Sequence, residues 1–303
     1  MTTPLFFNPA QNVPGLSVYG PGAGKPQRFM DYARHFDFRS YGPACTGRVT
    51  PITRDDLLLV HDADYVDGVF SGVILNGFEN RDPRVPESCL WTIGSLLAGA
   101  RYAIAQPWQP VCSPTSGYHH AGHNFGGGFC TFNGLLVVAA KLIAENPALK
   151  IGILDCDFHY GDGTADILKH YPALAQSIIH RTQGQHFHGE DVEGEALEFT
   201  VWLDESIQEL NAFGCDLVLY QAGADPHVDD PLGGFLTSAG LVQRDTAVFC
   251  GIHAPVVWNL AGGYQTGKTN HFLHDPVLTI HYATLRASNA SCGERLQHIE
   301  SKK

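Results

Sequence analysis

The sequence has no excess of positive charge. Its 303 residues include 19 Lys and Arg against 31 Asp and Glu, which gives a formal net charge of −12 at pH 7. A protein that binds nucleic acid through phosphates needs a basic surface, so the composition argues against a nucleic-acid partner. An acidic surface can steer a cationic substrate toward a site, but the simpler interpretation of the charge is solubility.

The sequence also lacks cysteine pairs, a leader and long apolar runs. Its eight cysteines form no C-x-x-C pair, and in a chain of this length they are expected to be free thiols. Residues 1–15, MTTPLFFNPAQNVPG, have neither the basic start nor the apolar stretch of a signal peptide. No apolar run approaches the ~20 residues that cross a membrane. We therefore expect a cytoplasmic protein with no membrane partner.

What the sequence does contain is an alternation of short apolar runs with helical patterns. This alternation predicts an α/β fold with a central, mostly parallel sheet and helices on both faces. No repeat or linker interrupts it, so residues 1–303 are expected to form a single domain. Functional sites in such folds form where loops leave the carboxyl ends of strands. The expected strands are Leu57–His61, Pro110–Cys112, Lys150–Asp155, Ser177–His180, Phe199–Leu203, Leu217–Gln221 and Val256–Leu260, and the expected helices are Leu90–Ile104, Gly134–Glu145, Ala165–His170, Glu205–Phe213 and Ala239–Cys250.

In the stretch ILDCDFHYGDGT, residues 153–164, an apolar strand is followed directly by polar residues. Alternate side chains of an extended chain point the same way, so Asp157 and His159 can converge on one point. A carboxylate oxygen and an imidazole nitrogen suit Zn²⁺. A polar loop with a hydrogen-bonded histidine would give the same pattern, so this stretch alone leaves both interpretations open.

The stretch SGYHHAGHNFGGGFCTFN, residues 116–133, holds two adjacent histidines in a glycine-rich loop. At a metal centre, neutral His119 and His120 could take a proton from water and return one to a leaving group. Each imidazole would need an acid to fix its tautomer, and Asp155 and Asp162 are available. On its own, a histidine pair more often has no catalytic role.

Two later stretches add a third carboxylate and a tyrosine. In YQAGADPHVDDPLGG, an apolar strand ends before Asp225, which would complete an Asp–His–Asp set; His227 is a rival ligand. Asp229 and Asp230 precede a proline and fit a turn better than a ligand role. In WNLAGGYQ, Tyr264 follows two glycines, where its hydroxyl could donate to a substrate carbonyl.

In this order, the segments HHA…GFCxxN, DxDxHxGDG, GADxHxxDPLGG and GGY resemble the histone deacetylase superfamily. This superfamily consists of zinc-dependent deacylases, among them acetylpolyamine amidohydrolases and bacterial relatives. The resemblance spans roughly residues 25–285, and it is closest to small bacterial and class IV-like members. It implies the arginase/deacetylase fold, an α/β domain with a central parallel sheet of about eight strands.

The resemblance also implies a reaction and a role for each matched residue. The reaction is the hydrolysis of an N-acyl amide, on acyl-lysine or a related acylated amine, with one Zn²⁺ per chain. The implied residues are Asp157, His159 and Asp225 as zinc ligands; His119, His120, their partners Asp155 and Asp162, and Tyr264 as catalytic residues; Phe129 and Phe187 as walls of the acyl-lysine channel; and Gly117 as a backbone contact to the substrate.

Several points stay open at this stage. Many relatives hold a structural K⁺ through backbone carbonyls near the zinc ligands and a serine hydroxyl; that serine aligns here with Ile178, one residue from Ser177. A binuclear Mn²⁺ ureohydrolase of the same fold is one alternative function. A non-enzymatic module that binds acyl ligands or regulates another protein is a second. The natural substrate, peptide or small molecule, and the oligomeric state are not predicted.

Overall fold

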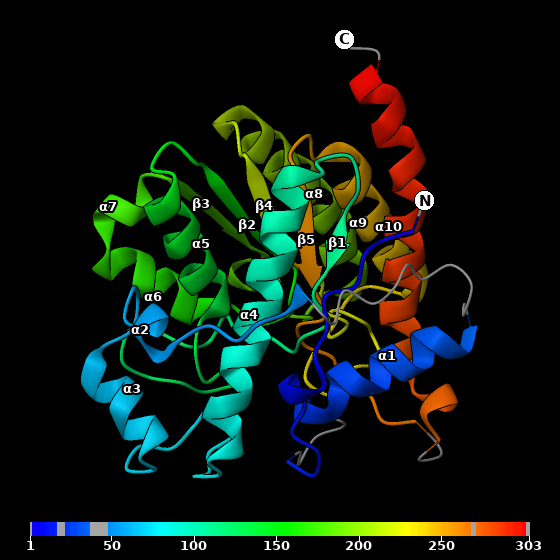
Figure 1. Cartoon of the computed structure of the whole chain (residues 1–303). Coiled ribbons are helices and arrows are strands. Elements are labelled where there is room, and N and C mark those ends of the chain that lie inside the picture. The colour runs from blue at the N-terminus through cyan, green and yellow to red at the C-terminus, as the bar shows by residue number, and fades with distance from the viewer. Residues whose placement is uncertain (1, 17–21, 37–47, 268–270, 301–303) are drawn as a thin grey trace.

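The computed structural model describes residues 2–16, 22–36, 48–267 and 271–300, which form one α/β unit around a parallel sheet (Figure 1). The strand order is β1-β5-β4-β2-β3, and every pair is parallel. The described residues thus contain a sheet of five strands, where about eight were expected. The strands are β1 (Val111–Cys112), β2 (Ile151–Asp155), β3 (Ile178–Thr182), β4 (Leu217–Gln221) and β5 (Val256–Asn259).

Side chains of the central strands alternate between two hydrophobic cores, one on each face of the sheet. In β4, Leu217 and Leu219 belong to one core, whereas Val218 and Tyr220 belong to the other. Every residue of β2 and β4 is buried. Strands that are covered on both faces are apolar almost throughout, which explains why the sequence marks them so clearly.

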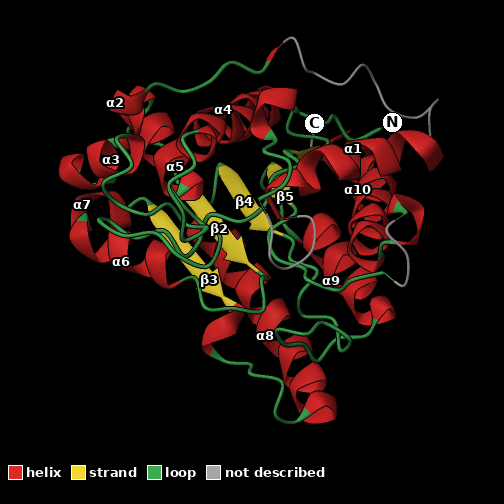
Figure 2. Ribbon diagram, turned by 90° about the horizontal axis from the view of Figure 1, so that it is seen from below, coloured by secondary structure: helices red, strands yellow, loops and turns green. Residues whose placement is uncertain are grey.

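Helices cover both faces of the sheet, as expected. Helices α3, α4, α5 and α6 contribute to one core, and α1, α8, α9 and α10 contribute to the other. Figure 2 shows α4 and α5 on one side of the strands and α8 and α9 on the other. The helices are α1 (Lys25–Phe36), α2 (Arg54–Leu57), α3 (Ala63–Phe70), α4 (Arg84–Ala105), α5 (Gly134–Glu145), α6 (Asp162–His170), α7 (Pro172–Ala175), α8 (Val192–Phe213), α9 (Ser238–Gly251) and α10 (Pro276–Glu300).

The strand expected at Leu57–His61 is wrong. Helix α2 occupies the start of this segment, and a turn follows it. Thr53 begins the helix through a capping box: its hydroxyl accepts the N–H of Asp56, and the Asp56 carboxylate accepts the N–H of Thr53. This reciprocal cap satisfies backbone donors that a strand would leave unpaired, so the apolar run after it does not become a strand.

The strand expected at Phe199–Leu203 is also wrong, because these residues lie inside α8. The buried side chains of α8 include Phe199, Trp202, Ile207 and Leu210, a spacing that follows the period of a helix and not the alternation of a strand. The β-branched and aromatic residues between them gave the misleading strand pattern. The other expected strands and helices all fall on elements of the same type.

Two expectations on composition can be compared with the structure. Cys45 and the side chain of Cys292 lie outside the described residues. The other six cysteines form no disulfide: Cys89, Cys112, Cys130, Cys156, Cys215 and Cys250. Among the helices of the described part, none combines the length and apolar character that a transmembrane span requires.

Candidate active site

Polar side chains end the three central strands and form a buried hydrogen-bonded row. The Asn259 amide of β5 donates to Gln221 Oε1 of β4 at 3.0 Å, and Gln221 Nε2 donates to Asp155 Oδ1 of β2 at 3.3 Å. All three residues are buried, and such networks hold side chains in one arrangement. Asp155 is thereby oriented toward the loops at the carboxyl end of the sheet. Gln221 and Asn259 were not among the expected site residues, although a polar residue that ends an apolar strand is a usable signal.

The structure brings Asp157, His159 and Asp225 together at this edge. His159 Nδ1 lies 3.2 Å from Asp157 Oδ1 and 3.0 Å from Asp225 Oδ2. One potential ligand atom from each residue lies within 4.8 Å of the others. The carboxylates are buried, whereas the imidazole is partly exposed. Two carboxylate oxygens and one imidazole nitrogen form a donor set that suits a divalent metal ion.

The surroundings of the two carboxylates fit a divalent cation. Asp225 is fully buried, yet its Oδ1 atom has no hydrogen-bond partner among the described residues, which is costly for an acceptor. A Cβ atom on Gly262 would lie 2.4 Å from Asp225 Oδ2, and one on Gly223 would lie 2.4 Å from Asp225 Oδ1. Only glycine therefore lets the backbone close so tightly here. The Gly262 N–H also donates to Asp157 Oδ2 at 2.8 Å.

The electrostatics of this group also favour positive charge at its centre. Burial, together with the charge of Asp157, raises the pKa of Asp225 to about 7. Burial disfavours a charge on His159, but its hydrogen bonds to Asp157 and Asp225 outweigh this and raise the pKa of the imidazole to about 11. The two carboxylates thus hold a cationic group between them, and a metal ion bound there would take over that role.

His119 lies beside this group and is held by Asp155. Its Nδ1 donates to Asp155 Oδ2 at 2.8 Å, and its Nε2 lies 3.6 Å from Asp157 Oδ1. Burial disfavours the charged imidazole, but the carboxylates of Asp155 and Asp157 outweigh burial and raise the pKa of His119 to about 9. The bond to Asp155 fixes the tautomer, so Nε2 is the nitrogen that faces the centre.

His120 is held in the same way by a more exposed acid. Its Nδ1 donates to Asp162 Oδ1 at 2.7 Å, and its ring centroid lies 6.0 Å from that of His159. Asp162 begins α6, where the helix dipole favours a negative charge. Partial burial opposes ionisation of Asp162, but the hydrogen bond to His120 lowers the pKa of this carboxyl. Both expected His–Asp pairs are therefore formed.

Tyr264 completes the ring of side chains around the centre. Its ring centroid lies 6.1 Å from that of His159 and 5.6 Å from that of Phe129. Its backbone N–H donates to Asp230 Oδ2 at 2.7 Å. Burial and the nearby carboxylates raise the pKa of the phenol, so the hydroxyl keeps its proton. Asp230, which the sequence analysis assigned to a turn, thus anchors the loop that carries Tyr264.

Phe129 forms one wall of the pocket that leads to this centre. It adopts a left-handed backbone with φ of +66°, a strained conformation for a bulky residue that is typical of functional sites. Phe78 lies against it, with ring centroids 5.7 Å apart. Gly77 joins the two loops, since its carbonyl accepts the Phe129 N–H at 2.9 Å. No sequence signal marked Phe78.

Gly117 and Phe187, the other two residues expected to contact the substrate, lie in different places in the structure. Gly117 lines the pocket together with His119 and Tyr264. Phe187 is buried in the core, with its ring 5.3 Å from Phe235 between centroids, and it is not among the residues that line the pocket. The aromatic residues that pack against Phe129 in the described structure are therefore Phe78 and Tyr264.

A buried lysine at the start of α1 is a further pocket residue that the sequence analysis missed. Lys25 lines the pocket beside Asp157 and Tyr264, and its ammonium donates to the carbonyl of Ala261. Burial lowers the pKa of Lys25, and the carboxylates of the centre oppose that effect. Ala261 itself has a positive φ of 51°, so a second strained residue borders the pocket.

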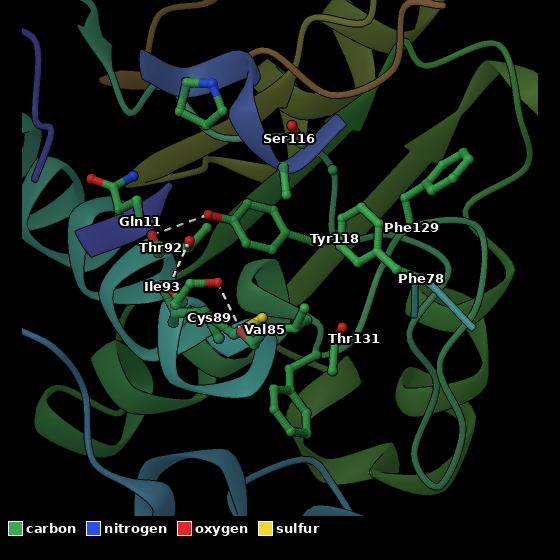
Figure 3. A pocket seen from close by; sticks show the side chains of 15 residues that line it. Gln11, Phe78, Val85, Cys89, Thr92, Ile93, Ser116, Tyr118, Phe129 and Thr131 are labelled. Carbon is green, nitrogen blue, oxygen red and sulfur yellow. Dashed lines mark hydrogen bonds between the residues drawn. The ribbon is translucent and has the colours of Figure 1, made fainter. Parts of the chain in front are cut away.

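A second cavity of about 50 Å³ adjoins the pocket and shares Phe78, Gly117 and Phe129 with it. Tyr118 lies within this cavity and donates its hydroxyl to the Thr92 carbonyl of α4 at 3.2 Å. Figure 3 shows the Tyr118 hydroxyl turned toward Thr92, with Phe78 on the other side of the ring. The cavity therefore lies between α4 and the loops that form the pocket wall.

His227, the alternative metal ligand, is hydrogen-bonded to other residues. His227 Nε2 is hydrogen-bonded to Ser238 Oγ at 2.9 Å, and His227 Nδ1 accepts the Asp229 N–H at 3.1 Å. Both ring nitrogens therefore have partners away from the three-residue group. The Asp229 side chain is 79% exposed, as expected for a turn residue.

The alignment used for the K⁺ expectation does not fit the strand register. Ile178 lies opposite Ile151 at the start of β2, whereas Thr182 lies opposite Asp155 at its end. Ile178 and Ser177 thus lie at the far end of the strand pair from Asp155. A hydroxyl beside Asp155 would have to come from Thr182, whose Oγ1 accepts the Gly161 N–H at 3.2 Å.

Comparisons with known proteins agree with this fold. The profile of the family described as "Histone deacetylase domain" matches residues 25–204. An uncharacterized protein of Picosynechococcus sp. is 30% identical over 229 residues, which are 69% of this chain and 75% of that protein. The acetylpolyamine amidohydrolase of Mycoplana ramosa is 29% identical over 206 residues, which are 60% of this chain and 59% of that enzyme.

Two solved structures show the same fold at low sequence identity. The HD domain of HDA15 superposes with a TM-score of 0.72 and 18% identity, covering 98% of this chain and 93% of that one. Acetylpolyamine aminohydrolase from Burkholderia pseudomallei gives a TM-score of 0.68 and 18% identity, covering 95% of this chain and 98% of that one. Because the family profile matches more than half of the sequence, the chain belongs to the histone deacetylase domain family.

Proposed function

We propose that the protein is a zinc-dependent amidohydrolase that removes the acyl group from an N-acylated amine, such as acyl-lysine or an acylated small amine. The observation that carries this proposal is the convergence of Asp157, His159 and Asp225 beside two histidine–carboxylate pairs. Family membership supports it, as do relatives that bear the names deacetylase and acetylpolyamine amidohydrolase.

Asp157, His159 and Asp225 would hold the zinc ion. When bound, the ion would polarise the acyl carbonyl and lower the pKa of a water molecule at the open position. The protein's own contribution begins with geometry: the strand ends and Gly262 hold the two carboxylates in one place before substrate arrives. A preformed site of this kind avoids the cost of ordering its groups during reaction.

His119 and His120 would carry the protons. In each, Nδ1–H is donated to an aspartate, so Nε2 is the ring nitrogen that would take up and release a proton. A cation held by Asp157 and Asp225 would offset the carboxylate charge that raises the pKa of His119, so its imidazole would be neutral and able to act as a base. Either imidazole can take the proton of the attacking water. We assign protonation of the leaving amine to His120, because its side chain is 22% exposed against 3% for His119, so a departing amine could reach it.

Tyr264 would act on the carbonyl oxygen. Its phenol stays protonated because burial and nearby carboxylates raise its pKa, so its hydroxyl can donate to the oxygen as negative charge develops there. A donor of this kind contributes about 10²–10³ in rate. The bond between its backbone N–H and Asp230 holds the loop in the required position.

The alternative metal centre is a pair of Mn²⁺ ions. A second ion would need further free carboxylates, but Asp155 and Asp162 are bonded to His119 and His120, and Asp229 is largely exposed. Within the described residues, one group alone has three metal-ligand side chains close together. The geometry therefore favours one ion.

The test is a substrate screen with the metal content measured in parallel. Zinc-loaded protein should hydrolyse at least one member of a panel of N-acyl-lysine peptides of increasing acyl length and of acetylated polyamines, and a hydroxamate should inhibit it. No turnover of any member at one bound zinc per chain would favour the non-enzymatic module. Two bound Mn²⁺ per chain would favour the ureohydrolase.

A further inference from the structure

Arg244 is a fully buried residue of α9 that reaches the backbone beneath the metal-ligand group. Its side chain is 0% exposed. Its Nη1 atom donates to the Gly223 carbonyl at 2.7 Å and to the Cys156 carbonyl at 3.2 Å. Cys156 directly precedes Asp157, and Gly223 lies two residues before Asp225. One guanidinium thus bonds to both loops that carry the carboxylate ligands.

These two carbonyls lie where the sheet can no longer hold the strands together. The pairing of β2 with β4 ends at Asp155 and Gln221, and the bond from Cys156 N–H to the Gln221 carbonyl, at 3.0 Å, is the last between these strands in the described structure. Buried carbonyls beyond that point still need donors. Arg244 supplies them, and so extends the connection past the end of the ladder.

The charge of Arg244 is balanced locally, so its effect on the ligands is geometric. Its Nε donates to Asp245 Oδ1 at 2.9 Å. Tyr220 and Thr284 also donate their hydroxyls to this carboxylate, at 2.5 and 2.6 Å. Asp245 is therefore fixed by three donors, and it orients the guanidinium plane toward the carbonyls.

The two loops that Arg244 joins are packed tightly against each other. A Cβ atom on Gly223 would lie 2.8 Å from Asp157 Cα and 2.4 Å from Asp225 Oδ1. The two ligand loops thus touch at Gly223, and a shift of either carbonyl must move a ligand carboxylate. Small displacements of metal ligands weaken a site strongly.

We propose that Arg244 is a positioning residue for the metal centre, which sets the spacing of Asp157 and Asp225 through the Cys156 and Gly223 carbonyls. The inference rests on the metal centre of the proposed function. It extends that centre to a side chain that is not among the residues lining the pocket.

The test is Arg244→Lys, which keeps the positive charge beside Asp245. A single ammonium cannot reproduce the planar fork that bonds one carboxylate and two carbonyls. The zinc dissociation constant of the metal-free variant, measured by competition with a chromophoric chelator, should rise about 10- to 100-fold. An unchanged constant, within twofold of the wild type, would overturn the proposal.

Tyr220→Phe is the matched control. It removes one hydrogen bond to Asp245 and leaves the bonds of Arg244 to both carbonyls intact. Its urea midpoint should fall, while its zinc dissociation constant stays within twofold of the wild type. If Tyr220→Phe weakened zinc binding as much as Arg244→Lys at an equal loss of urea midpoint, Arg244 would have only a general structural role.

A second variant covers the case in which Arg244→Lys does not fold. Arg244→Gln combined with Asp245→Asn removes the ion pair as a unit and leaves no unpaired buried charge; weaker zinc binding is again expected, and an unchanged constant contradicts the proposal. The readout of these experiments is metal affinity and not activity. A wild-type protein that binds zinc but hydrolyses nothing would therefore refute the proposed function and leave the role of Arg244 untouched. A wild-type protein that binds no zinc would refute both.

Discussion

The imidazole rings of His119 and His120 lie with centroids 4.1 Å apart, yet their carboxylate partners have different surroundings. The Asp155 side chain is fully buried, whereas that of Asp162 is 52% exposed. The His119 pair is therefore enclosed by protein, and the His120 pair has access to solvent. This asymmetry makes the two pairs distinguishable by experiment.

Asp155→Asn and Asp162→Asn should differ in their effect on stability. Asp155 accepts bonds from His119, the Asp157 N–H and Gln221, and an amide in its place would turn an N–H toward donors. We expect Asp155→Asn to lower the free energy of unfolding by about 1–3 kcal/mol, and Asp162→Asn to lower it by less, because the Asp162 carboxylate is 52% exposed and solvent weakens its interactions. Urea denaturation of both metal-free variants measures this. Equal losses would contradict the asymmetry described above.

His120→Ala should remove catalysis without unfolding the protein. The proposed general acid is lost, and such groups contribute about 10²–10⁴ in rate. The His120 side chain lies at the partly exposed side of the centre, so the fold has little dependence on it. The rate constant kcat on the best acyl-amine substrate, together with circular dichroism, checks both parts. A variant that keeps more than about a tenth of the activity would exclude the assigned role.

Tyr264→Phe should slow hydrolysis by about 10²–10³ because it removes one donor to the developing oxyanion. Phenylalanine keeps the ring that packs against His159, and the backbone bond to Asp230 remains. Zinc content, measured by atomic spectroscopy, should therefore equal that of the wild type. Loss of zinc from this variant would mean that Tyr264 supports the metal centre and not the carbonyl.

Zinc should stabilise the wild-type protein against heat, and Asp225→Asn should abolish this effect. A ligand present at 100 times its dissociation constant stabilises the folded state by about 2.7 kcal/mol. Thermal denaturation of chelator-treated protein, with and without zinc, measures the shift. His227→Gln is the matched control, since both its ring nitrogens are bonded elsewhere; a shift lost in His227→Gln would make that residue a ligand.

The stability of the protein should fall as pH drops from about 6.5 to about 4, partly because of His61. This imidazole donates from Nδ1 to the Gly122 carbonyl and accepts the Asn133 N–H at Nε2, and burial lowers its pKa to about 4. In the unfolded chain its pKa is about 6.5. Within that window the unfolded state binds a proton that the folded state excludes, which costs up to about 3 kcal/mol at pH 4.

The contribution of His61 can be isolated by comparing pH profiles. Urea denaturation between pH 4.5 and 7.5 should give a shallower slope for His61→Gln than for the wild type. His170→Gln, on the exposed end of α6, serves as the control and should keep the wild-type slope. Parallel profiles for His61→Gln and the wild type would show that His61 is not the titrating group.

The convergence of Asp157, His159 and Asp225 could be predicted from the sequence because these residues follow a local rule. Central strands such as β2 and β4 are apolar throughout, so the first polar residues after them mark the carboxyl edge of the sheet. Alternation along an extended chain then pairs Asp157 with His159. This rule does not extend to helix α8. Its residues Phe199–Leu203 have strand propensity, which helical packing overrides.

The residues that support the site could not be predicted in the same way. Arg244 contacts the Cys156 carbonyl across 88 positions of sequence, and Phe78 meets Phe129 through loops without a distinctive pattern. Such contacts depend on how separate elements pack. The periodicity of residues within one element does not predict them. Phe187 was expected to line the acyl-lysine channel because of its place near a motif. Its ring instead packs in the core against Phe235.

The crossed order of the strands determines when the metal centre can form during folding. His159 and Asp225 are separated by 66 positions, and the bond between Gly262 and Asp157 spans 105. Contacts of such high contact order are closed late, since loop entropy must be lost before they form. A nascent chain therefore has no assembled pocket until β5 has joined the sheet, and metal uptake can serve as a kinetic marker for the completed topology.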